Sequence, residues 1–141
     1  MLWNAATTEL LSFFKTKWEA ARPGTPIHYP ATAPVSPGAD GSWGRLSIMP
    51  SYSKRIAVGG QLRQQGGVIV VNMFVPIGFG DTLAVTLDGI ITTIWDGARD
   101  NGLNGEIHLD APMAIPGIRD PDTPNLWRAG VSVPFVVYHA P

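Results

Sequence analysis

The feature that most constrains the fold is a nearly unbroken apolar run, Val68 to Val75, which reads VIVVNMFV. Strands that are apolar at almost every position occur where both faces of a sheet are covered, whereas strands with one wet face alternate apolar and polar residues. The run is also far shorter than the roughly 20 apolar residues of a membrane-spanning helix. It therefore predicts a strand in the middle of a sheet, covered on both faces.

The residues before this run predict a long hairpin over residues 55–75. Arg55 to Leu62 has the pattern of a strand with Ile56 and Val58 pointing inward. Gln65-Gly66-Gly67 has the composition of a turn, because glycine adopts the backbone conformations that tight turns require.

Three further segments are predicted as strands. Residues 43–50 alternate between apolar and polar, and residues 106–109 form a short strand. In residues 126–138, four apolar residues share one side: Val131, Val133, Phe135 and Val137. Pro134 cannot donate a backbone hydrogen bond, so we expect this last strand to lie at an edge or to bend there. Residues 112–124 hold four prolines and are predicted to be irregular.

Two segments have the three- and four-residue apolar spacing of helices. We expect the first to be capped by Thr7 or Thr8 and to end at Pro23-Gly24. The second follows Gly78-Phe79-Gly80 and ends at Asp96-Gly97. Their apolar stripes are Leu10, Leu11, Phe14, Trp18 and Ala21 in the first, and Leu83, Leu87, Ile90, Ile91, Ile94 and Trp95 in the second.

The order of these elements predicts one α+β domain over residues 1–141. Two helices pack on a largely antiparallel or mixed sheet, which gives a two-layer architecture. The chain shows neither an internal repeat nor a domain linker. At this length a single hydrophobic core forms without disulfides or metals.

The composition favours a protein that works in an assembly. Charged residues make up 15% of the chain, below the roughly 25% of typical domains, and hydrophobic residues make up 45%. A surface with few charges is often covered by a partner, although a monomer with a polar, Gly- and Pro-rich surface is the alternative. The net charge of −1 does not predict nucleic acid as a main ligand. We expect neither a signal peptide nor a membrane span.

Motifs that carry chemistry are sparse. The absence of cysteine excludes disulfides, thiolate zinc sites and a cysteine nucleophile. The Gly78-Phe79-Gly80 segment lies between a strand and a helix, but Leu83 stands where a dinucleotide loop has its third small residue. Glu106, His108 and Asp110 alternate along a short strand, a pattern of metal sites and of soluble edge strands alike. We therefore predict no catalytic residue, cofactor or metal, and expect no enzyme.

Three tryptophans near the ends of predicted elements are candidate subunit contacts: Trp3, Trp43 and Trp127. Tryptophan is enriched at the centres of protein interfaces, and packing in the core is the alternative. The proline-rich residues 30–41 are predicted as a loop or an extended arm that could lie on a neighbouring subunit.

Three basic residues on or beside the predicted hairpin are candidates to face DNA in a pore: Lys54, Arg55 and Arg63. Non-specific contact with DNA requires only a few pairings with phosphates. A solvated surface is the alternative.

Three segments resemble one known family. The block from Gln65 to Gly80 places a glycine pair, an apolar strand, a proline and a Gly-x-Gly entry before a helix. Ile27 to Pro30 forms a short strand after the first helix, and Trp127 to Val133 reads W-x-x-x-V-x-V. Together with the element order, these segments resemble the tail terminator proteins of siphovirus-type phage tails and gene transfer agents. The stretch 112–124 departs from this likeness.

The resemblance implies a structural protein of the virion or of a virus-like particle. Such subunits form a hexameric ring at the head–tail junction, after assembly in the bacterial cytoplasm. The ring caps the tail tube protein, ends its polymerisation, binds a head-completion protein and lets DNA pass. A different head–tail connector subunit, or a small enzyme or ligand-binding domain with an unmarked site, is the alternative.

Overall fold

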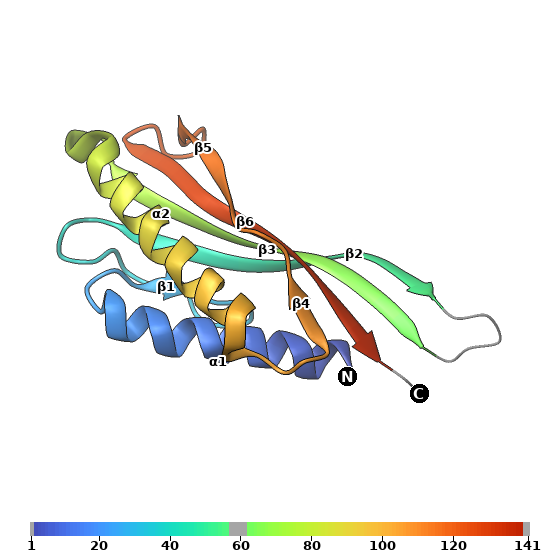
Figure 1. The fold of residues 1–141 in the computed structure, drawn as a ribbon. Coiled ribbons are helices and arrows are strands. Elements are labelled where there is room, and N and C mark those ends of the chain that lie inside the picture. The colour runs from blue at the N-terminus through green and yellow to red at the C-terminus, as the bar shows by residue number, and fades with distance from the viewer. Residues whose placement is uncertain (1, 57–61, 140–141) are drawn as a thin grey trace.

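A computed structural model describes residues 2–56 and 62–139, with the backbone alone at 79–81, 101 and 102. The chain folds as an α+β domain with two helices and a mixed sheet of six strands, as predicted (Figure 1). The elements in chain order are α1 (Trp3–Ala21), β1 (Ile27–His28), β2 (Trp43–Arg55), β3 (Arg63–Pro76), a 3-10 turn (Ile77–Phe79), α2 (Gly80–Gly97), a π-helical turn (Ala98–Gly102), β4 (Ile107–Leu109), β5 (Met113–Arg119) and β6 (Leu126–His139).

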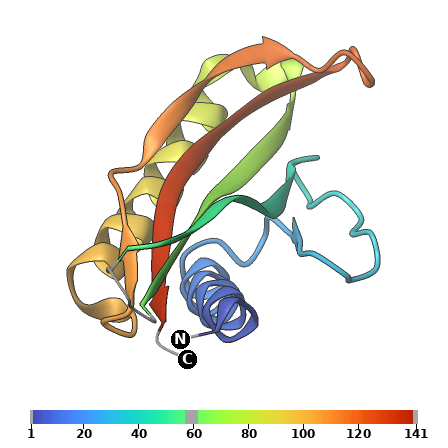
Figure 2. The ribbon, with the colours of Figure 1, turned by 90° about the vertical axis from the view of Figure 1, so that its right-hand side faces the viewer.

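The two longest strands, β3 and β6, form the centre of the sheet. The strand order is β1-β2-β3-β6-β4, and β5 pairs with β6 on the same side as β4. Only β1 is parallel to its neighbour, β2. The sheet is strongly twisted, so that β2 and β6 cross at a large angle in Figure 2. The apolar run in β3 therefore lies in mid-sheet, as predicted.

Both helices cover the same face of the sheet, and the core lies between the two layers. Alternate residues of β3 and β6 point toward the helices and are buried. Phe14 of α1 stacks on Trp95 of α2 with a distance of 5.2 Å between the ring centroids, which joins the helices above the sheet. The buried strand residues are Ile69, Val71, Met73 and Val75 of β3, and Val131, Val133, Phe135 and Val137 of β6.

The second face of the sheet has no helix over it, so the prediction that both faces of β3 are covered is wrong. Val68 and Val70, which point to this face, are only half-buried. Phe74 is buried there because the Trp43 ring stacks on it, with 4.2 Å between the ring centroids. The apolar side chains on this face therefore have a role other than packing against a helix.

The long hairpin exists, but its predicted boundaries are wrong. β2 continues from Trp43 through Pro50 to Arg55, and β3 begins at Arg63, so the hairpin spans residues 43–76. Pro50 lies at a bulge where no strand pairs with the outer edge of β2, a setting that tolerates proline. Ile56 is exposed rather than inward, and Val58 lies outside the described residues.

The segment predicted as the turn, Gln65-Gly66-Gly67, lies inside β3 instead. A Cβ atom on Gly66 would collide with the Tyr52 ring. A Cβ atom on Gly67 would lie 2.6 Å from Trp3 Cη2 and 2.9 Å from Phe135 Cε1. Glycine is present here because aromatic rings lie against both faces of the strand, and not because the chain turns.

The first helix begins earlier than predicted. α1 starts at Trp3, whose ring stacks on Phe135 with 5.3 Å between the centroids and holds the first turn against the sheet. The hydroxyl groups of Thr7 and Thr8 donate hydrogen bonds to the Asn4 carbonyl within the helix, so neither residue is the cap. Ala21 is exposed, while the rest of the stripe packs in or against the core.

Two predictions about prolines near the C-terminus need correction: residues 112–124 are not wholly irregular, and the strand with Pro134 does not lie at an edge. Residues 113–119 form β5, in which Pro116 lies at a bulge between Ile115 and Ile118. β6 is an interior strand, with β3 on one side and β4 and β5 on the other. The Pro134 carbonyl accepts a hydrogen bond from the Asp110 amide, so its nitrogen faces the gap between β4 and β5, where no ladder bond is lost.

The proline-rich segment is tied to the body of its own subunit. Arg22, directly after α1, forms an ion pair of 2.9 Å with Asp40 near the end of this segment. Although burial opposes it, hydrogen bonds from Ser42 and the charge of Arg22 hold the pKa of Asp40 below its ordinary value. Whether residues 30–41 also lie on a neighbour stays a prediction.

No helix within residues 2–56 and 62–139 has the length and apolar character needed to cross a membrane.

Candidate interaction surface

The uncovered face of the sheet carries large apolar side chains from both of its edges. Met49 on β2 is 51% exposed and Met113 on β5 is 60% exposed. Their partners in register, Val68 and Ser132, point to the same face, opposite the helices. Exposed apolar side chains gathered on one face of a sheet suit a contact with another protein.

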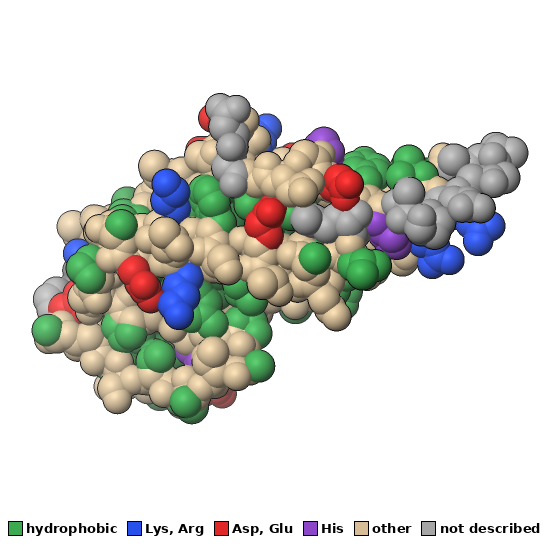
Figure 3. Space-filling view, turned by 90° about the horizontal axis from the view of Figure 1, so that it is seen from below, with side chains coloured by type: hydrophobic (Ala, Val, Ile, Leu, Met, Phe, Trp, Pro, Cys, Tyr) green, Lys and Arg blue, Asp and Glu red, His purple; other side chains and the backbone are tan. Residues whose placement is uncertain are grey.

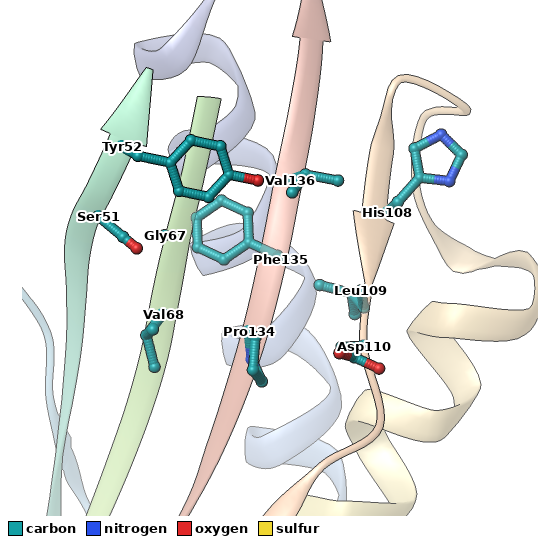
Figure 4. Close-up of a pocket in the computed structure, with 10 residues that line it drawn as sticks. All are labelled: Ser51, Tyr52, Gly67, Val68, His108, Leu109, Asp110, Pro134, Phe135 and Val136. Carbon is teal, nitrogen blue, oxygen red and sulfur yellow. The ribbon is translucent and has the colours of Figure 1, made fainter. Parts of the chain in front are cut away.

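A shallow groove of about 370 Å³ crosses this face near the projecting hairpin. Figure 4 shows Tyr52 of β2 on one side of the groove and His108 of β4 on the other. Val68, Pro134 and Val136 line its floor. The lining is mainly apolar, which suits a side chain or a peptide segment better than a charged ligand.

The three basic residues predicted to face DNA lie together at the hairpin end. Lys54 and Arg55 end β2, and Arg63 begins β3 as the register partner of Arg55. All three are exposed. In Figure 3 basic side chains gather at the narrow right-hand end of the molecule, beyond the helices. That these residues face DNA stays a prediction.

The three tryptophans proposed for subunit contacts are all half-buried. Trp3 stacks on Phe135 and holds the start of α1 against the sheet, and Trp43 stacks on Phe74 at the start of β2, so both make contacts within their own subunit. Trp127 packs beside Gly117 of β5, where a Cβ atom would lie 2.8 Å from the indole Cε2. A contact with another subunit stays a prediction for all three.

Glu106, His108 and Asp110 do not form a metal centre. Across residues 2–56 and 62–139, no three or more His, Cys, Asp or Glu side chains converge in a manner that could hold a metal ion. His108 lies edge-on to the Tyr138 ring, with 5.2 Å between the centroids. An Asp110 carboxylate oxygen accepts a hydrogen bond from the Ala111 amide.

A carboxylate that the sequence patterns did not single out lies in a pocket of about 330 Å³ between α2, β5 and β6. Asp88 lines this pocket, and its Oδ1 atom is buried with no hydrogen-bond partner among the described residues. The other lining residues are small or apolar: Ala84, Val85, Gly117, Trp127 and Ala129. An unpaired carboxylate in such surroundings is destabilising, which makes the pocket a candidate site for a partner group.

Burial raises the pKa of Asp88 to about 7. Burial is the cause of the shift, and the nearby cations Arg119 of β5 and Arg128 of β6 do not compensate the carboxylate. A signal was present in the sequence, because Asp88 follows Ala84 by four residues and precedes Ile91 by three. This spacing places it on the apolar stripe of the helix.

Asp88→Asn should stabilise the isolated subunit at pH 8 by about 1–2 kcal/mol, a value reduced for the partial exposure of the carboxyl group. The folded-state pKa lies above the ordinary value of 3.8, so the folded protein binds the proton more tightly than the unfolded chain. The free energy of unfolding therefore falls as the pH rises from about 4 to about 7. Urea denaturation at pH 4 and pH 8 should show the gain at pH 8 alone; an equal gain at both would contradict it.

The fold occurs in proteins of known structure. Among these, 25 chains are similar to this one. One of them, whose name states no family or function, matches with a TM-score of 0.67 at 21% sequence identity, over 96% of this chain and 97% of its own. At this identity the likeness concerns the fold alone. No protein-family model and no curated protein matches the sequence.

Proposed function

We propose that the chain is a structural subunit of a phage-type tail, a tail terminator rather than an enzyme. In this proposal six copies form a ring at the head–tail junction. The ring caps the tube of tail protein, ends its growth and offers a surface to the head-completion protein, and DNA passes through its pore. The proposal rests on the sequence resemblance and on exposed surfaces that suit contacts between subunits.

The observation that carries the proposal is the sheet face that no helix covers. A two-layer domain that acted alone would place mainly polar residues on such a face. Here Met49, Tyr52, Met113 and Ile118 are exposed on it, in a chain with few charged residues. Burial of these side chains against other chains would remove apolar surface from water, which is the main driving force of protein association.

The projecting end of the hairpin is a second feature that suits a ring. The ends of β2 and β3 reach past the two helices on the right of Figure 1. Such an extension offers a contact surface away from the body of the domain, toward a neighbouring subunit or the tail tube. The groove of Figure 4 opens beside this extension, so apolar and basic contact surfaces adjoin.

Electron microscopy of particles from cells that lack this chain tests the proposal. Because a terminator ends polymerisation, its loss should give tubes of uneven length that are not joined to heads. Supplying the intact chain in trans should restore joined particles of uniform tail length, and a label on the chain should mark the junction. Uniform tails with heads attached in its absence would contradict the proposal. Uniform tails without heads would indicate a connector subunit instead.

A further inference from the structure

Charge is unevenly divided between the hairpin and the rest of the chain. Residues 43–76 contain four basic residues and no acidic residue, a net charge of +4. The remaining residues contain the other six Lys and Arg and all eleven Asp and Glu, a net charge of −5, which gives the total of −1. Opposite charges on two parts of one subunit favour contacts in which the first part of one copy meets the second part of another.

The basic end of the hairpin, defined as Lys54, Arg55 and Arg63, offers cations that are free to pair. Arg55 and Arg63 are opposite each other across the two strands, and like charges in that position repel. Lys54 lies over the Tyr52 ring, with 5.6 Å from Nζ to the ring centroid. None of the three makes an ion pair with a residue in the part of the chain that the structure describes.

The Asp88 pocket is complementary to these cations in charge and in its apolar lining. Val85, which lines the pocket, is 67% exposed, so a side chain from another molecule can reach the pocket. Inside are a carboxylate oxygen that lacks a partner and the Trp127 ring. A Lys or Arg side chain has both parts that this pocket would take, an aliphatic stem for the apolar wall and a cation for the carboxylate. A guanidinium group also stacks on an indole ring.

We propose that the basic end of the hairpin of one copy docks into the Asp88 pocket of a second copy, where Arg55 or Arg63 pairs with Asp88 against Trp127. The inference rests on the proposed function and deepens it, because it names the two surfaces that join neighbouring subunits. The cation compensates the charge that burial leaves unpaired in the isolated subunit.

The two surfaces lie at opposite ends of the molecule. In Figure 1 the hairpin end is on the right, whereas the first half of α2 and the start of β6, which line the pocket, are on the left. A contact between two different surfaces is heterologous, so each copy gives its hairpin to one neighbour and receives a hairpin from the other. Repetition of such a contact closes into a ring when the rotation between copies permits it.

Chemical cross-linking tests the contact directly, because the chain has no cysteine. Ser53→Cys places one thiol in the exposed hairpin end and keeps all three cations, and Val85→Cys places another at the rim of the pocket. Each variant is labelled differently, and the two are mixed and treated with a short bis-maleimide reagent. The experiment is done on purified protein and again on particles assembled from both variants. We expect a product that joins the two labels.

The matched control is Ser12→Cys, an exposed position on α1 outside both surfaces, mixed with Val85→Cys. Adding Asp88→Asn to the Val85→Cys copy should lower the yield of the hairpin product roughly tenfold or more. The same change should stabilise that subunit alone, so a loss of folding cannot explain the lower yield.

Yields that do not exceed the Ser12→Cys control, in solution and in particles alike, would overturn the inference. If duplex DNA also binds the intact protein and not an Arg55→Gln, Arg63→Gln variant, the basic end of the hairpin faces DNA instead. This outcome leaves the proposed function in place, because that function is tested separately by electron microscopy of the head–tail junction. Conversely, if the cross-link forms but the chain is absent from that junction, the proposed function is contradicted and the contact between copies stands.

Discussion

Ile91→Asp is expected to abolish folding of the domain. Ile91 is fully buried on α2, in the core between the helices and the sheet. An aspartate there would be a buried charge without a partner, which costs more than about 4 kcal/mol. The whole stability of a domain is only about 5–15 kcal/mol. Circular dichroism and the soluble yield of the purified variant measure the effect, and Leu87→Asp, at another fully buried position of α2, should behave alike.

Val85→Asp is the matched control for this prediction. It introduces the same side chain on the same helix, at a position that is 67% exposed. We expect a folded, soluble protein with stability within about 0.5 kcal/mol of the parent. A folded Ile91→Asp variant, or an unfolded Val85→Asp variant, would mean that the buried face of α2 is assigned wrongly.

Gly130→Ala should have the second largest effect, a loss of about 3 kcal/mol in the free energy of unfolding. Gly130 is buried in β6 beside β3. A Cβ atom there would collide with the Val71 carbonyl oxygen and lie 3.1 Å from Asn72 Cα. These are backbone atoms of a central strand, so they cannot move aside as the end of a flexible side chain can. Urea denaturation gives the change as a lower midpoint at unchanged slope.

Gly89→Ala is the same substitution in a different environment and should have the opposite sign. No atom lies within 4 Å of the added Cβ, and the residue lies on an exposed part of α2. Alanine in a helix is more stable than glycine by about 0.5–1 kcal/mol, because the unfolded chain loses less freedom on folding. A loss at Gly130 below about 1 kcal/mol would show that the two central strands can separate locally.

Pattern alone located part of the candidate interaction surface. Lys54, Arg55 and Arg63 were found because they cluster beside a hairpin, and Trp127 because it stands near the end of an element. Asp88 was overlooked because its place on the apolar stripe of α2 does not by itself show what covers the carboxylate. Its role depends on β5 and β6, which lie roughly 30 to 40 residues further along the chain and bury it.

Local periodicity determined the class of the fold. Val68 to Val75 form an apolar run of strand length, and Leu87, Ile91 and Trp95 recur with the spacing of a helix, whatever the rest of the chain does. Each pattern commits its segment to one type of secondary structure, because only that arrangement removes its apolar side chains from water. Two helices and a sheet in one domain follow from the sequence by itself.

Only the tertiary structure decided where the strands end and which surfaces remain open. Gly66 and Gly67 belong to a strand because Tyr52, Trp3 and Phe135 approach them, and Pro134 is tolerated in an interior strand because it faces the gap between β4 and β5. Both helices lie on one side of the sheet, so its other face stays uncovered. These outcomes depend on contacts between residues far apart in the chain, which no local pattern contains.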